Sequence, residues 1–352
     1  TLFRSADLPA ILKETFVDDK LINDFLVNIL HTADSVYELL KPYLKFKLNK
    51  RDNHKEVYHT EFQICSMIAN YFNARYATYT FDEQHHNIIG RNIETSCLNS
   101  TFDIYKTEFK CNAFKKYLVD IMNDVWKGTG DKRMDDVAIN QHYYTDEITR
   151  ETMESELDHW INQINSSRHE YSNVGVPKSA EKLLLSVIYN CSFSAYEQND
   201  DINYDIEHLA PKGCLKLLLK QFPYGEGITN GLPISSFANL CLLREEINRK
   251  KKDKTLYQDL QYLNSLEKKN ITLEEIENKF SFTQKTDLDW VNDHFENFEA
   301  LKSAYFRFLY LRYERQKRMI INNLFPDDEQ IHSMKNETYS SSRINVSQQS
   351  NH

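Results

Sequence analysis

The stretch YDIEHLAPKG, residues 204–213, places two ionisable side chains, Glu207 and His208, side by side in an apolar run, with Pro211 three positions later. The unperturbed pKa of an imidazole lies close to neutral pH, so His208 is a candidate general base. A carboxylate such as that of Glu207 is one of the oxygen ligands that Mg²⁺ prefers. These residue types indicate proton transfer beside a hard cation, provided that the chain supplies further groups.

Two amide side chains and a basic run follow downstream. Asn239 precedes the apolar letters LCLL, and Asn248 stands nine positions after Asn239, directly before RKKKDK. The amide oxygen of Asn248 is again a hard oxygen donor. A Glu-His-x-x-Pro motif alone is a weak signal. Followed by Asn-Leu, an Asn nine positions on and then lysines, it is a fairly specific one, although it covers only residues 204–254 of the 352.

This pattern resembles the HNH, or ββα-metal, nuclease superfamily in its His-Asn-Asn form. It is most similar to the C-terminal nuclease module of the GmrSD-like restriction proteins, which cut modified DNA. The letters IEHLAP, ANLCLL and RKKKDK match that module, except that Ala238 stands where Gly is usual. The resemblance implies that His208 activates water, that Glu207 and Asn248 hold Mg²⁺ or Mn²⁺, and that Asn239 holds the loop and orients His208.

Each of these residues also has a plainer interpretation. Glu207 and His208 together would otherwise be an exposed pair at the end of a strand. Asn239 could be the N-cap of a helix, which is a common role for asparagine and is compatible with a nuclease site. Asn248 could be a solvated helix residue.

Basic residues surround the motif, and beside a metal ligand we predict that they contact phosphates. By default such a run is only a solvated helix face. The net charge of the chain is −9, so any nucleic-acid contact must come from a local patch or from another part of the native protein. The predicted nucleic-acid contacts are Lys212, Arg249, Lys250, Lys251 and Lys254.

Composition favours helices over a turn-rich β architecture, because the chain has only 8 Gly and 7 Pro. No apolar run is long enough to span a membrane, and we expect no membrane partner. The six cysteines are scattered without a CxxC pair, which argues against a structural zinc site or a disulfide scaffold and indicates a reducing cytoplasm.

The predicted fold class is α+β, mostly helical with a small ββα-metal module near 198–255. We predict a helical domain over 1–196, the nuclease module over 197–256, C-terminal helices packing on it over 257–325, and a disordered tail over 326–352. What the N-terminal region recognises stays open between a DNA modification, a nucleotide signal and a partner subunit.

The resemblance predicts a metal-dependent DNA endonuclease that acts in restriction or defence against phage, on modified or phage DNA. The acidic-Gly-Gln-Gln-Arg signature of the nucleotide-dependent domain of GmrSD-like proteins is not found in the chain. The chain is therefore expected to be a fragment, a separate subunit or a divergent relative. Two alternatives stay open: a degenerate, non-cutting DNA-binding or regulatory module, and an RNA-cleaving, toxin-like nuclease.

Overall fold

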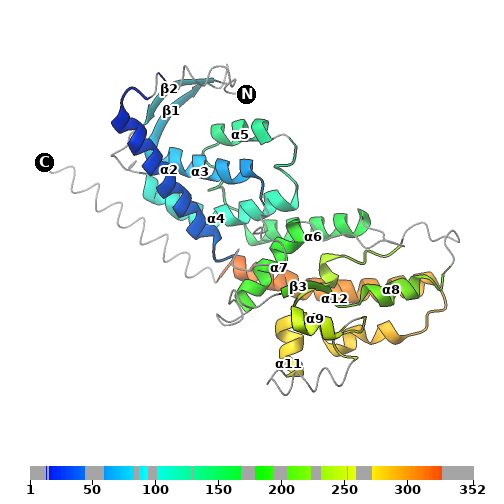
Figure 1. Ribbon diagram of the computed structural model, residues 1–352. Coiled ribbons are helices and arrows are strands. Elements are labelled where there is room, and N and C mark those ends of the chain that lie inside the picture. Colours follow the sequence, from blue (N-terminus) through cyan, green and yellow to red (C-terminus); the bar gives the residue numbers. More distant parts are fainter. Residues whose placement is uncertain are drawn as a thin grey trace. The chain divides into compact units, whose positions relative to one another are not determined.

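Figure 1 shows the computed structural model of the protein. The structure describes residues 13, 16–43, 59–82, 87–93, 101–128, 130–167, 179–192, 204–222, 231–251, 253–258 and 272–326. Within these residues helices dominate, and the β-structure consists of two antiparallel sheets of two strands each. The predicted α+β class with mostly helical content is therefore confirmed. Apart from Pro326, the predicted disordered tail lies outside the described residues.

The chain divides into two compact units. The first comprises residues 1–42, 59–149 and 325–352, and the second comprises residues 43–58 and 150–324. No helix in the part of the chain that the structure describes is long and apolar enough to cross a lipid bilayer.

Aromatic side chains form much of the core of the first unit. Its described helices are α2 (Asp19–Leu40), α3 (Glu61–Tyr76), α4 (Phe102–Met122) and α5 (Gly130–Ile139). Helix α2 starts after Asp18, whose carboxylate accepts a hydrogen bond of 2.7 Å from the backbone N–H of Leu21. The ring of Tyr71 on α3 meets the rings of Tyr105 and Phe109 on α4 edge-on, a favourable geometry for aromatic pairs.

A β-hairpin interrupts the helices of the first unit. Strand β1 (Ala77–Asp82) pairs antiparallel with β2 (Asn87–Ile93), with an irregularity between Thr80 and Phe81. The letters ATYTFD and NIIGRNI carry the β-branched and aromatic residues that favour strands. The prediction that residues 1–196 are mostly helical missed this hairpin.

The second unit contains the elements of the predicted nuclease motif. It includes two helices, within residues 150–192, that the sequence assigned to a separate N-terminal domain, so the predicted boundary at 196/197 differs from the division at 149/150. The described elements are α6 (Arg150–Ser167), α7 (Ser179–Ser192), β3 (Tyr204–His208), α8 (Lys212–Leu219), η1 (Phe237–Asn239), β4 (Leu240–Arg244), α9 (Glu245–Lys251), α11 (Leu273–Glu275), η2 (Ile276–Ser281), η3 (Lys285–Asn292) and α12 (Phe298–Leu324).

Helices α7 and α12 form the buried centre of the second unit. Leu185, Ile188 and Tyr189 of α7 are fully buried, as expected for a helix that is apolar over most of its surface. The long helix α12 packs against α6, α7 and η1. Tyr305 of α12 is fully buried as well. The strands that carry the motif are therefore attached to a helical core.

Candidate active site

Strands β3 and β4 and helix α9 form a strand–strand–helix unit. The two strands are antiparallel, with Glu207 opposite Cys241 and His208 opposite Leu240. Helix α9 follows β4 without an intervening residue, because β4 ends at Arg244 and α9 begins at Glu245. Helix α8 lies in the long connection between the strands.

One face of this unit gathers acidic, amide and cationic side chains. Asp205 and Glu207 are two positions apart on β3, so they point to the same face. The Asn248 amide nitrogen donates a hydrogen bond of 3.2 Å to Asp205 Oδ2, and Lys251 Nζ donates one of 2.8 Å to Glu207 Oε1. The structure therefore brings Glu207 and Asn248 to the same side of β3. The sequence-based prediction missed Asp205, which the Asp-x-Glu spacing within a strand could have revealed.

Lys251 is an internal cation and not a surface one. Its side chain is 0% exposed, whereas that of Glu207 is 18% exposed. Removing an ammonium group from water is costly unless a counter-charge is close, and Glu207 supplies that charge. In this structure Lys251 therefore does not lie on the exposed basic surface on which it was predicted to contact phosphate.

His208 occupies the last position of β3, where strand alternation directs it to the face opposite Glu207. The residue is 9% exposed, and its Nε2 lies 3.1 Å from the hydroxyl oxygen of Ser235. Burial lowers the pKa of His208 to about 4, with further contributions from the positive charges of Lys212 and Lys251. The imidazole is therefore neutral at neutral pH, which is the form that can accept a proton.

Asn239 is fully buried and fastens the loop that follows His208. Its Oδ1 accepts a hydrogen bond of 2.9 Å from the Ala210 backbone N–H, and its Nδ2 donates to the carbonyls of Ala210 and Ile234 at 3.1 and 2.8 Å. The His208 ring is hydrogen-bonded to Ser235, whereas Asn239 contacts the backbone of the loop that follows His208. The preceding Ala238 does not have a positive φ, so its backbone does not require the glycine of the resembled module.

Helix α12 holds the same loop from the other side. The fully buried Arg312 donates from Nη1 to the Ala238 carbonyl at 2.7 Å and from Nε to the Ser281 carbonyl at 2.8 Å. The Tyr305 hydroxyl donates to the Pro233 carbonyl at 3.0 Å. No local sequence pattern identifies these contacts, because the residues lie 74, 31 and 72 positions from their partners.

The predicted phosphate contacts differ in their surroundings. Lys212 and Lys254 are exposed. Arg249 is exposed too, and its guanidinium forms an ion pair with Glu245 one turn earlier in α9. The side chain of Lys250 lies outside the described residues. Apart from Arg249, which is paired with Glu245, the predicted contacts that lie at the surface are thus Lys212 at the start of α8 and Lys254 after α9.

The donors on the shared face suit a hard cation. Two carboxylates and one amide provide oxygen atoms of the kind that Mg²⁺ and Mn²⁺ bind. Lys251 Nζ already lies at Glu207 Oε1, so a divalent cation bound by Glu207 would share that carboxylate with the ammonium group or displace it. Within the described part of the chain, this face included, no group of three or more His, Cys, Asp or Glu side chains is arranged to bind a metal ion. Asn248 would therefore have to complete the donor set.

Comparisons of the chain with models of protein families, with curated proteins and with solved structures found no match.

Proposed function

We propose that the protein is a metal-dependent endonuclease of the HNH type that hydrolyses DNA phosphodiester bonds, in restriction or in defence against phage. The observation that carries the proposal is the gathering of Asp205, Glu207, Asn248 and Lys251 on one face of β3 and α9, with His208 as the next residue of the strand. The resemblance of this motif to the HNH superfamily supports the choice of reaction.

In this proposal each side chain has a defined task. His208 is neutral at neutral pH and accepts a proton from the attacking water. Glu207 and Asn248, with Asp205 beside them, hold Mg²⁺ or Mn²⁺ through their oxygen atoms. A metal held there would supply the charge that polarises the scissile phosphate and stabilises the leaving oxygen. Asn239 keeps the backbone after His208 in place.

One observation favours a second candidate, a non-cutting DNA-binding module. His208 is buried, lies on the face of β3 opposite Glu207 and is bonded to Ser235. Hydrolysis requires its ring to reach the same phosphate as the cation held by Glu207. A module that has lost hydrolysis needs no such convergence.

Incubation of supercoiled plasmid with the purified chain separates the two candidates. We expect nicking with Mg²⁺ or Mn²⁺ and none with EDTA. The variant His208→Ala should lose about 10²- to 10⁴-fold in rate, because it lacks the general base. His31→Ala, which removes an exposed histidine of α2, is the matched control and should cut like the parent.

Full cleavage by His208→Ala would refute the assignment of the base. Absence of cleavage by the parent with either metal would favour the non-cutting module. Digestion of tRNA under the same conditions tests the RNA-cleaving alternative, and faster cleavage of tRNA than of plasmid would replace DNA as the substrate.

A further inference from the structure

Helix α8, labelled in Figure 1, carries three lysines on one of its faces. Lys212, Lys216 and Lys220 recur every four residues along the helix and its C-cap, so their side chains follow the same side. The opposite side packs into the second unit through three buried leucines, Leu215, Leu218 and Leu219. Lys212 and Lys220 are exposed and Lys216 is partly exposed. The lysine row, residues 212, 216 and 220, therefore faces solvent.

The charges of the lysine row are not neutralised within the described part of the chain. None of its three ammonium groups forms an ion pair there. The sequence from Leu209 to Phe222 contains no Asp and no Glu. Like charges one helical turn apart repel each other by about 0.2–0.5 kcal/mol per pair. A bound polyanion would relieve this repulsion.

The lysine row begins beside the candidate base. Helix α8 starts at Lys212, four positions after His208. Asn239 fixes the loop between them, because its side chain forms two hydrogen bonds, of 2.9 and 3.1 Å, with the backbone of Ala210. A phosphate backbone held by the row would therefore lie next to the loop that follows the candidate base.

The segment after α9 brings one carboxylate to the start of α8. Cys214 Sγ donates a hydrogen bond of 2.9 Å to the Asp253 carbonyl. A Cβ atom at Gly213 would lie 2.7 Å from Asp253 Oδ1, so this carboxylate lies at the first turn of α8. Lys216 and Lys220 lie one and two turns further along the helix. They are therefore the better probes of an attraction to phosphate.

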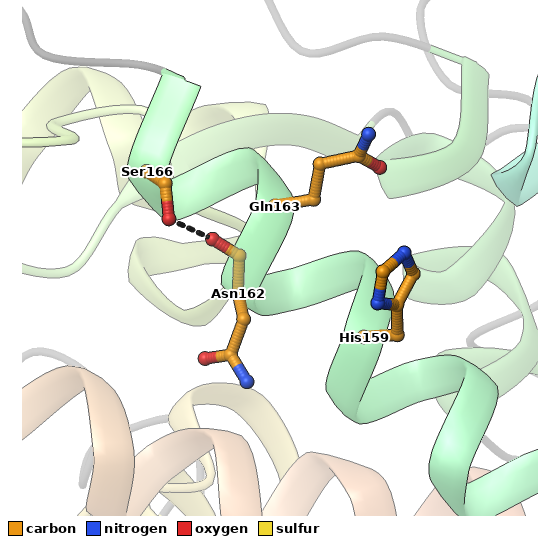
Figure 2. A pocket seen from close by; sticks show the side chains of 4 residues that line it. All are labelled: His159, Asn162, Gln163 and Ser166. Atoms are coloured by element: carbon orange, nitrogen blue, oxygen red, sulfur yellow. Dashed lines mark hydrogen bonds between the residues drawn. The ribbon is translucent and has the colours of Figure 1, made fainter.

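The hollows beside α6 offer no comparable charge. The described residues that line the hollow shown in Figure 2 are His159, Asn162, Gln163 and Ser166. None of these four is a lysine or an arginine. In the neighbouring hollow between α6 and α12, the ammonium group of Lys317 is paired with both Asp158 and Glu314. The lysine row is therefore a better candidate for contacts with phosphates than either hollow.

We infer that the lysine row of α8 binds the phosphate backbone of duplex DNA. The inference rests on the proposed function, because it takes DNA as the substrate. From Lys212 to Lys220 the helix rises by about 12 Å, at about 1.5 Å per residue. A DNA strand carries one phosphate per about 3.4 Å of helix axis. Laid along one strand, the row therefore lies within reach of about three phosphates, one for each ammonium group.

Anisotropy of a labelled DNA duplex tests the inference in EDTA, where a metal-dependent enzyme does not cleave. Each phosphate contact contributes about 0.9 to the steepness with which log K falls against log salt. The double variant Lys216→Gln/Lys220→Gln should therefore reduce this steepness by about 1.8. It should also weaken binding about tenfold or more at about 0.1 M salt.

A second pair of lysines provides the matched control. Lys106 and Lys110 have the same spacing on α4, are exposed and form no ion pair among the described residues. Lys106→Gln/Lys110→Gln removes the same charge from the chain and should keep the salt dependence of the parent. Lys216→Arg/Lys220→Arg keeps the positive charges and should keep it too. Urea denaturation checks that each variant unfolds like the parent.

Three results would overturn the inference. The first is an unchanged salt dependence in Lys216→Gln/Lys220→Gln. The second is an equal reduction in Lys106→Gln/Lys110→Gln, because the effect would then follow from net charge alone. The third is absence of duplex binding by the parent. Tighter binding of an RNA duplex of the same sequence would overturn the assignment to DNA.

Binding in EDTA and plasmid nicking fail independently. A parent chain that does not nick plasmid, but whose salt dependence changes in Lys216→Gln/Lys220→Gln as predicted, would refute the proposed nuclease and leave the phosphate-binding surface standing. Nicking by the parent, together with an unchanged salt dependence in that variant, would refute the surface and leave the nuclease standing.

Discussion

At the scale of single residues, the environment of His208 links the candidate base to the stability of the fold. Burial and two nearby positive charges lower its pKa from 6.5 to about 4. The unfolded chain therefore takes up a proton between these two pH values, and the folded chain does not. Folding stability consequently falls as the pH is lowered from about 6.5 to 4.

A substitution at this position measures the effect. The shift corresponds to about 3 kcal/mol at the acidic end of this interval. His208→Gln, which cannot take up the proton, should show a flatter decline of the free energy of unfolding between pH 7 and pH 4. Urea denaturation at these two pH values checks this, and the same decline in parent and variant would contradict the assigned pKa.

The Lys251–Glu207 pair is expected to matter for stability because the ammonium is buried. Lys251→Met leaves Glu207 without its partner in a mostly buried place and should cost about 2 kcal/mol of unfolding free energy. Lys41→Met breaks an exposed pair with Glu38, whose side chains are 48% and 64% exposed, and should cost close to nothing. Urea denaturation compares the unfolding free energies of the two variants. Equal losses of unfolding free energy would show that the buried pair contributes no more to stability than the exposed pair.

Among the structural elements, helices and strands with a regular pattern of apolar residues could be predicted from the sequence. Features that depend on contacts between residues far apart in the sequence could not. The helical texture indicated α7 and α12, and the resemblance to the ββα-metal superfamily implied the paired strands around Glu207 and Asn239. Strand and helix periodicity also contained the signal for Asp205 and Lys251. Asp205 lies two positions before Glu207, and Lys251 lies three positions after Asn248 on the same side of α9.

Long-range contacts account for the rest. Arg312 would be read from its helix as an ordinary charged surface residue. It is fully buried, and the carbonyls of Ala238 and Ser281 accept hydrogen bonds from its guanidinium. The sequence around position 312 contains no pattern that predicts these hydrogen-bond partners. The same holds for Ser235, which meets His208 across 27 positions.

Helix α12 is thus predicted to fix the loop that carries Asn239. Arg312→Met removes the hydrogen bonds to the carbonyls of Ala238 and Ser281. These buried carbonyls then have no donor from residue 312, which should cost about 3–5 kcal/mol of unfolding free energy. Tyr305→Phe removes a neutral hydroxyl that donates to the carbonyls of Pro233 and Ile234, and it should cost about 1 kcal/mol. Urea denaturation ranks the two variants. A smaller loss for Arg312→Met than for Tyr305→Phe would contradict the role assigned to the arginine.

For the whole molecule, the net charge and the position of the exposed lysines in the second unit limit where DNA could bind. The net charge is −9, so a uniform attraction to DNA is not available. Within the second unit, exposed Lys212 and Lys254 lie on the chain close to the site residues. Attraction to phosphate would therefore be concentrated at the candidate site, and binding there should weaken as salt rises.

The central claim is that the face formed by Asp205, Glu207 and Asn248 holds a divalent cation. Titration of the purified chain with Mn²⁺, followed by electron paramagnetic resonance, tests it most directly. The account predicts that Glu207→Gln weakens the binding of one Mn²⁺ per chain by about tenfold or more and that His208→Ala leaves it unchanged. Absence of bound Mn²⁺ in the parent, or equal affinity in Glu207→Gln, would contradict the account.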